Sequence, residues 1–226
     1  MTIDLDQLKY MILNCNYCHK RLYLGIQVLK SKPCIEYKTY DKWLKLDETG
    51  RLNVLFIAES PLPSQSFFYN VNEKNDLREK LLINALQFED DFEGLFLFKH
   101  FGYFLTDAIK CRVRKKDGTI PHRIIKKCSP FLSQELSILK PRKIVVLGQT
   151  ALKALYLASK QFREKLDKLR LRDIKLSYVR THYSKIIETQ TYKIFITSFP
   201  SEYFSRYRQN FWEKDLNELR QFVRYH

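Results

Sequence analysis

The sequence predicts an α/β fold: a three-layer α/β/α sandwich around a central, mostly parallel sheet of four strands. Two observations support this prediction, namely short uninterrupted apolar runs and helix-like segments between them. The runs cover residues 54–58, 103–106, 144–147 and 194–197. Continuous rather than alternating hydrophobicity is typical of parallel strands covered on both faces. Strands that alternate with helices imply right-handed crossovers, which place helices on both faces of the sheet.

The segments between these runs have apolar residues at helical spacing. The expected helices cover residues 3–13, 76–88, 129–139, 150–169 and 210–223. Asn75 or Asp76 is the expected cap of the second helix. Pro130 falls in the first turn of the third, where proline is favoured because its missing N–H has no intrahelical partner.

Length and composition favour one domain over residues 1–226, because 226 residues with 45% hydrophobic content can bury a sizeable core. The chain has no apolar run as long as a membrane span, and its start lacks the pattern of a signal peptide. We therefore expect a soluble, intracellular, cytoplasmic monomer without a membrane partner. The 40 Lys and Arg outnumber the 25 Asp and Glu and give a net charge of +15. Such a positive field attracts polyanions, and nucleic acid is the leading expected partner.

Two stretches concentrate this positive charge. The first, between Cys111 and Cys128, is expected to be a basic loop that contacts phosphates. Its basic residues are Arg112, Arg114, Lys115, Lys116, Arg123, Lys126 and Lys127. The second stretch, 160–185, also contains acidic residues, so a solvated helix explains it as well as a nucleic-acid contact does.

Four cysteines form two pairs, Cys15-x2-Cys18 and Cys111-x16-Cys128. An intracellular chain of this size seldom keeps structural disulfides, so four spaced thiols indicate one site for zinc or an iron–sulfur cluster. A zinc ribbon usually repeats the tight Cys-x2-Cys spacing, and the second pair lacks it. This asymmetry favours a [4Fe–4S] cluster, with zinc as the alternative. Cys34 is expected to be a small buried apolar residue.

Polar residues follow the predicted strands. In open α/β sheets, ligands bind beyond the carboxyl ends of the parallel strands. The residues at these ends are Glu59-Ser60-Pro61, Asp107, Gly148-Gln149-Thr150 and Ser198-Phe199-Pro200-Ser201. The sequence therefore predicts a site among these residues, before any comparison with a known family.

Several motifs follow one another along the chain. They are Cys15-x2-Cys18, Ala58-Glu59-Ser60-Pro61-Leu62, Thr106-Asp107, Lys110-Cys111-Arg112, Cys128 and Phe199-Pro200-Ser201. In order and spacing they resemble the iron–sulfur branch of the uracil-DNA glycosylase superfamily, often called family 4. In that branch the corresponding motifs are Cys-x2-Cys, Gly-Glu-Ala-Pro-Gly, Thr-Asn, Lys-Cys-Arg, a second cysteine and His-Pro-Ser. The resemblance runs through the whole chain.

This resemblance implies a DNA glycosylase of base excision repair. Such an enzyme flips a uracil or otherwise altered base out of single- or double-stranded DNA and hydrolyses its N-glycosidic bond. A [4Fe–4S] cluster on Cys15, Cys18, Cys111 and Cys128 would support a DNA-contacting loop. The implied catalytic residues are Glu59 and Asp107. The implied base pocket contains Ser60, Pro61, Phe67, Phe68, Tyr69 and Phe199. The implied DNA contacts are the basic residues of the first stretch together with Ser201.

Three positions depart from the family pattern. Asp107 replaces the asparagine that recognises uracil, and a carboxylate only accepts hydrogen bonds, so it suits purine-type donors better than O4 of uracil. An alternative is that Asp107 only pairs with a nearby Lys or Arg. Phe199 replaces the histidine that stabilises the departing base, for which His100, His122 or His182 could substitute in space. Gln65 and Ser66 replace an acidic pair, which leaves Glu59 as the best candidate to orient water, with Asp107 second.

Two other functions remain open. The departures at these positions favour a catalytically inactive iron–sulfur module that binds nucleic acid. A zinc-stabilised interaction protein is the third interpretation, and it predicts a colourless protein without iron.

Overall fold

The computed structural model describes residues 3–15, 17, 40–61, 67–111, 113, 120–166, 169–198 and 209–224, with the backbone alone for 40, 41 and 209–213. The elements, in chain order, are α1 (Leu5–Leu13), α2 (Tyr40–Trp43), β1 (Val54–Ala58), α3 (Asp76–Glu79), the π-helix η2 (Lys80–Ala85), α4 (Asp91–His100), β2 (Tyr103–Asp107), α5 (His122–Leu139), β3 (Lys143–Leu147), α6 (Gln149–Ala158), α7 (Lys160–Lys165), the 3₁₀ turn η3 (Leu171–Asp173), α8 (Leu176–His182), β4 (Ile186–Glu188), β5 (Lys193–Thr197) and α10 (Gln209–Arg224).

The described residues form a five-stranded sheet in the order β2-β1-β3-β5-β4. The four predicted strands are its parallel members, and each lies within one residue of its predicted bounds. Every residue of β1, β2 and β3 is buried, as continuous apolar runs covered on both faces require. The fifth strand, β4, pairs antiparallel with β5 at the edge and was not predicted, because three residues give too short a pattern.

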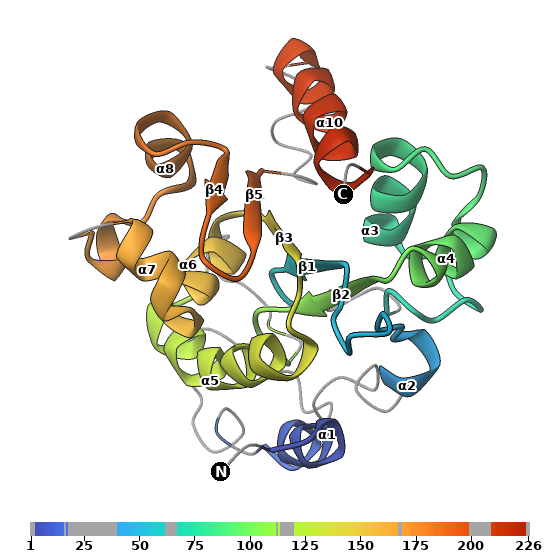
Figure 1. The fold of residues 1–226 in the computed structure, drawn as a ribbon, viewed down its shortest axis with the longest axis horizontal. Helices are drawn as coiled ribbons and strands as arrows, with labels where there is room; N and C mark the ends of the chain where they lie inside the picture. The colour runs from blue at the N-terminus through green and yellow to red at the C-terminus, as the bar shows by residue number, and fades with distance from the viewer. Residues whose placement is uncertain are drawn as a thin grey trace.

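Helices cover both faces of the sheet, which confirms the predicted α/β class (Figure 1). On one side α6 packs against β1 and β3, and α5 packs against α6 and α1. On the other side α10 packs against β5 and η2, and α4 packs against β2 and η2. In the described part of the chain, no helix combines the length and the apolar character that crossing a membrane would need.

The helix expected at 129–139 begins seven residues earlier, at His122, and Pro130 lies inside it. A proline has no N–H to donate to the carbonyl four residues back, here that of Lys126. The Ser129 hydroxyl donates to this Lys126 oxygen instead, at 3.1 Å, so the helix continues through the proline. The segment before Cys128 is therefore helical, which corrects the expectation that the whole stretch up to Cys128 is a loop.

Two other expected helices are also interrupted. The helix expected at 150–169 is split into α6 and α7 at Ser159, whose hydroxyl accepts the N–H of Phe162 and caps the second helix. The helix expected at 76–88 begins at the predicted Asn75 cap and changes to a π-helix after Glu79. Both interruptions depend on local hydrogen bonds, which the spacing of apolar residues in the sequence does not reveal.

Candidate active site at the carboxyl edge of the sheet

The carboxyl ends of the parallel strands meet at one edge, as the sequence predicts. Ala58 of β1 lies in register with Asp107 of β2, and the Ala58 carbonyl accepts the N–H of Ala108 at 2.8 Å. The Gly148 N–H, after β3, donates to the Thr197 carbonyl of β5 at 2.8 Å. This edge therefore brings together three of the predicted groups: Glu59, Asp107 and the turn at Gly148.

Glu59 connects this edge to the start of α6. Its carboxylate accepts a hydrogen bond from the Thr150 hydroxyl at 2.5 Å, and its carbonyl accepts the N–H of Ile109 at 2.9 Å. Gly148 makes the turn with φ of 92° and ψ of 179°, a conformation that essentially only glycine adopts. Glu59 is half-buried, and the Thr150 hydroxyl fixes its carboxylate at the N-terminus of α6.

Asp107 ends β2 and is only 4% exposed. Its backbone carbonyl accepts a hydrogen bond from the Lys110 ammonium at 2.6 Å. The same ammonium forms a buried ion pair with Glu135 of α5 at 2.7 Å and also donates to the Thr106 hydroxyl at 2.9 Å. Lys110 therefore has its carboxylate partner in Glu135 and fixes the Asp107 backbone between β2 and α5.

The aromatic run Phe67-Phe68-Tyr69 lies against the first strands. Tyr69 is 8% exposed and stacks with both Trp43 and Phe104, and its hydroxyl exchanges hydrogen bonds with the backbone of Leu105. Phe68 is buried in the same cluster, whereas Phe67 is only partly buried. Phe67 is thus the member of the run whose ring remains partly accessible, while Phe68 and Tyr69 attach the run to the core.

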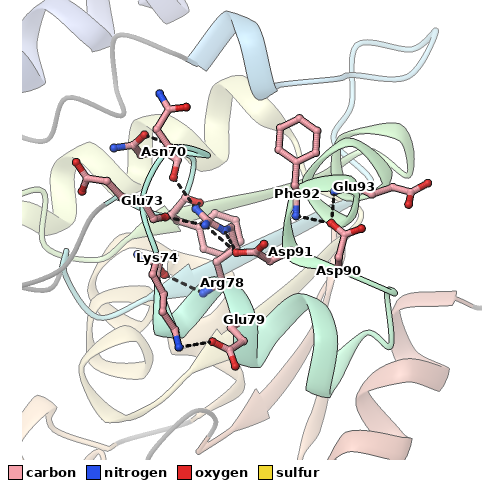
Figure 2. Close-up of polar contacts among 12 residues, drawn as sticks. Asn70, Glu73, Lys74, Arg78, Glu79, Asp90, Asp91, Phe92 and Glu93 are labelled. Atoms are coloured by element: carbon pink, nitrogen blue, oxygen red, sulfur yellow. Dashed lines mark hydrogen bonds and ion pairs between the residues drawn. The ribbon is translucent and has the colours of Figure 1, made fainter.

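A buried arginine organises the segment that carries these rings (Figure 2). Arg78 is 3% exposed, and each of its guanidinium nitrogens donates. Nε and Nη2 bond the Asp91 carboxylate at 2.8 and 2.7 Å. The remaining hydrogen bonds go to the backbone carbonyls of Phe68, Asn70 and Glu73, at 3.1, 2.7 and 2.8 Å. A single side chain therefore holds the turn after the aromatic run against α3 and α4.

The other predicted base-pocket residues are placed only in part. Ser60 is half-buried and Pro61 is buried, both directly after Glu59. Phe199 and Ser201 lie outside the described residues, as do Gln65 and Ser66. Of the histidines considered as substitutes, His100 ends α4 at the amino end of β2, on the opposite edge. His122 begins α5, after the carboxyl end of β2, and His182 ends α8 and stacks on Tyr178.

The cysteines are also placed in part. Cys111 and Cys128 are both 4% exposed, and Cys15 follows α1, which packs against α5. The Lys127 ammonium lies 4.6 Å from the ring centroid of Tyr17, so the chain after Cys15 runs beside the residue before Cys128. The described residues contain no group of three or more His, Cys, Asp or Glu placed to hold a metal ion. Cys18 and Cys34 lie outside that part of the chain.

The predicted DNA-binding residues fall into two sets. Arg123, Lys126 and Lys127 are exposed on the first turns of α5, where we had expected a loop. Arg112, Arg114, Lys115 and Lys116 lie outside the described residues. In the second basic stretch, Arg180 and Lys185 both pair with Asp215 of α10 at 2.6 Å. These two cations are therefore neutralised within the fold.

Sequence reasoning missed a basic contact on α6, the helix whose Thr150 bonds Glu59. The Lys153 ammonium, one turn after Thr150 on α6, lies 2.5 Å from Nε2 of His122. Burial and the nearby charge of Lys175 lower the pKa of Lys153, and burial and Lys153 lower the pKa of His122. The one sequence signal for Lys153 was its place on the helix after the Gly148 turn.

Comparisons with known proteins agree with this architecture. The family model described as the uracil DNA glycosylase superfamily matches residues 46–224. That range contains Cys111 and Cys128 and begins after Cys15 and Cys18. A type-4 uracil-DNA glycosylase of Pyrobaculum aerophilum is 42% identical over 53 residues. This match covers 23% of the chain and 26% of the relative, so the chain aligns with about a quarter of that protein's length.

Proposed function

This chain belongs to the uracil DNA glycosylase superfamily, and we propose that it is a DNA glycosylase of base excision repair that releases an altered base by hydrolysis. The observation that carries the proposal is the position of half-buried Glu59. Thr150 fixes its carboxylate at the edge of the sheet where β2 ends with Asp107. A carboxylate that a hydrogen bond holds in a fixed position can act as a general base and orient a water molecule. Glu59 is then the group that positions water at the sugar carbon as the bond to the base breaks.

Asp107 is the proposed group that recognises the flipped base. An ionised carboxylate only accepts hydrogen bonds, so it favours a base that presents adjacent donors, as guanine-like bases do with N1–H and the 2-amino group. O4 of uracil would face this carboxylate without a donor, which makes uracil the weaker substrate. Ser60, Pro61, Phe67 and Phe199 complete the proposed pocket, with Phe67 offering a partly accessible ring.

The four thiols of Cys15, Cys18, Cys111 and Cys128 are the proposed ligands of a [4Fe–4S] cluster. Thiolates are the usual ligands of such clusters, and the burial of Cys111 and Cys128 fits a site closed to water. A cluster bound there would join the two ends of the basic stretch between Cys111 and Cys128. It would thereby lower the entropy cost of holding that stretch against DNA. Zinc on the same thiolates is the alternative.

A catalytically inactive, iron–sulfur nucleic-acid-binding module is the second candidate. Gln65, Ser66 and Phe199 stand where the family has an acidic pair and a histidine, and their side chains supply neither a carboxylate nor an imidazole donor. Both candidate functions involve binding of single- or double-stranded DNA through the basic stretch between Cys111 and Cys128 and through Ser201. They differ in whether a base is released.

The test is base release from oligonucleotides that carry uracil, hypoxanthine, xanthine or oxidised guanine, measured as abasic sites. The protein is purified without oxygen, and its content of about four iron atoms per chain, with matching sulfide, is checked first. We expect release of a purine-type base. Glu59→Gln should slow release by roughly 10²–10⁴-fold and leave DNA affinity unchanged, because it removes only the charge that orients water.

Glu188→Gln is the matched control, since Glu188 is exposed on β4 and forms an ion pair with exposed Lys193. It should release the base at the wild-type rate. Base release that survives in Glu59→Gln would contradict the role of Glu59. DNA binding without release of any base in the panel would favour the inactive module instead.

A further inference from the structure

Three basic residues from separate elements lie close to one another near α6, the helix whose Thr150 bonds Glu59. His122 is the first residue of α5, Lys153 lies on α6, and Lys175 precedes α8. The Lys153 ammonium is 2.5 Å from Nε2 of His122, and α5 packs against α6. An ammonium can only donate, so the imidazole accepts and is neutral in this arrangement.

The side chain of Gln149 brings the third cation to the same place. Its amide nitrogen donates to the Ile174 carbonyl at 2.7 Å, and its amide oxygen accepts the Leu176 N–H at 2.6 Å. These two hydrogen bonds fix the backbone on either side of Lys175 against the first residue of α6. The position of Lys175 therefore follows from the turn at Gly148, which also places Thr150 on Glu59.

The ammonium groups of Lys153 and Lys175 repel each other, and the described residues do not neutralise them. Among these residues, no carboxylate forms an ion pair with His122, Lys153 or Lys175. Burial and Lys175 both lower the pKa of Lys153, as expected for a half-buried ammonium next to a like charge. Other basic residues of the second stretch have acidic partners, including Lys160 with Glu164 and Lys185 with Asp215. The cluster is thus a positive site that lacks its own counter-charge.

We propose that His122, Lys153 and Lys175 form a binding site for a phosphate group of the DNA backbone, next to the nucleotide that enters the Glu59 site. Thr150 and Lys153 are three residues apart on α6 and so share one face, about 4.5 Å apart along the helix axis. Because Thr150 donates to Glu59, a phosphate on Lys153 would lie about one helical turn from the hydroxyl that holds the Glu59 carboxylate. The location next to a reacting nucleotide rests on the proposed function, whereas the phosphate site itself does not.

DNA binding of Lys153→Gln tests the site. Affinity for an undamaged oligonucleotide is measured by fluorescence anisotropy over a series of chloride concentrations. Each neutralised phosphate contact adds about 0.9 to the slope of log affinity against log salt for duplex DNA, or about 0.7 for a single strand. We expect Lys153→Gln to reduce the slope by about one such contact and to weaken binding for every sequence.

Lys160→Gln is the matched control, because Lys160 is an exposed lysine of the same basic stretch that already pairs with Glu164. Its slope should equal that of the wild type. Equal slopes for Lys153→Gln and Lys160→Gln would overturn the proposal. Circular dichroism of both variants checks that they fold.

Inorganic phosphate distinguishes a DNA phosphate from a free phosphate. If phosphate shifts the His122 NMR signals while Lys153→Gln leaves the DNA salt slope unchanged, the site takes free phosphate, and the DNA proposal is overturned. Undamaged DNA requires no base release, so this result is independent of glycosylase activity. A reduced slope in a protein that releases no base would support the phosphate site and contradict the enzymatic proposal.

Discussion

Lys110 and Lys153 are both lysines that the fold partly or wholly removes from water, and they differ in what meets their charge. Lys110 is 1% exposed, and its ammonium pairs with Glu135 and also bonds Thr106 and the Asp107 carbonyl. Lys153 is half-buried and contacts the neutral ring of His122, with Lys175 nearby. A lysine that has a carboxylate partner stabilises the fold, whereas a lysine beside a neutral imidazole and a second lysine is available to an anionic ligand.

The same contrast separates the two sides of the proposed site. On the side of β2, α3 and α4, the buried cations are Lys110 and Arg78, and each has a carboxylate partner. On the side of α5, α6 and α8, His122 and Lys175 are exposed and Lys153 is half-buried beside His122, and among the described residues none of the three forms an ion pair with a carboxylate. In the proposed function, the first side therefore suits the binding of a base by rigidly held side chains. The second side suits the binding of the negatively charged DNA backbone.

The largest expected effect comes from breaking the Lys110–Glu135 pair. Glu135→Gln leaves a buried ammonium without its counter-charge, and removal of one partner of a buried pair typically costs about 3–5 kcal/mol. Urea unfolding followed by circular dichroism measures the loss of free energy of unfolding. The double variant Lys110→Met/Glu135→Leu should recover most of this loss, because it removes both charges. A single variant with a loss below about 1 kcal/mol would show that the pair is not a structural requirement.

A smaller effect is expected at the Arg78 network. Asp91→Asn removes the negative charge that meets Arg78 while the guanidinium keeps its bonds to the backbone carbonyls. Because the Asp91 side chain is 35% exposed, water compensates part of the loss, and we expect about 1–2 kcal/mol. The control is Glu79→Gln, because the Glu79 carboxylate pairs with exposed Lys74, and its loss should change the free energy of unfolding by less than about 0.5 kcal/mol. Equal unfolding midpoints for the two variants would contradict the structural role of Asp91.

The parallel strands and their common edge could be predicted from the sequence. Strands buried on both faces leave continuous apolar runs, and a parallel sheet brings their carboxyl ends to one edge, so Glu59, Asp107 and Gly148 were expected together. The start of α5 was not predictable from helix signals, because the hydrogen bond from Ser129 to Lys126 compensates for Pro130. That error placed Arg123 and its neighbours in a loop instead of on a helix.

The contacts that define the two sides could not be predicted. Lys153 and His122 are 31 residues apart, and Lys110 and Glu135 are 25 apart, so their meeting depends on how α5 and α6 pack. No local pattern distinguishes a lysine with a carboxylate partner from one beside a histidine. The charge of a basic stretch is visible in the sequence, whereas its neutralisation is a property of the tertiary structure.

The smallest expected effect is a dependence of stability on pH at His122. Burial and Lys153 lower the pKa of His122, so the folded protein binds a proton there less readily than the unfolded chain does. The contribution of His122 to stability is therefore fully present above the unfolded pKa of about 6.5 and is lost as the pH falls through the lowered folded value. The charged neighbour that lowers the pKa of His122 is Lys153 on α6, whose own pKa is lowered by Lys175 before α8.

NMR titration of the His122 ring measures this pKa directly. It should lie below that of an ordinary histidine, rise in Lys153→Gln, and stay unchanged in Lys160→Gln, because Lys153 contacts the ring and Lys160 pairs with Glu164. Inorganic phosphate that occupies the cluster should also raise it, since an anion favours the charged imidazole. A His122 pKa that does not respond to Lys153→Gln would mean that burial alone lowers it. The charge of Lys153 would then have no effect on His122, and the electrostatic contrast with Lys110 would not hold.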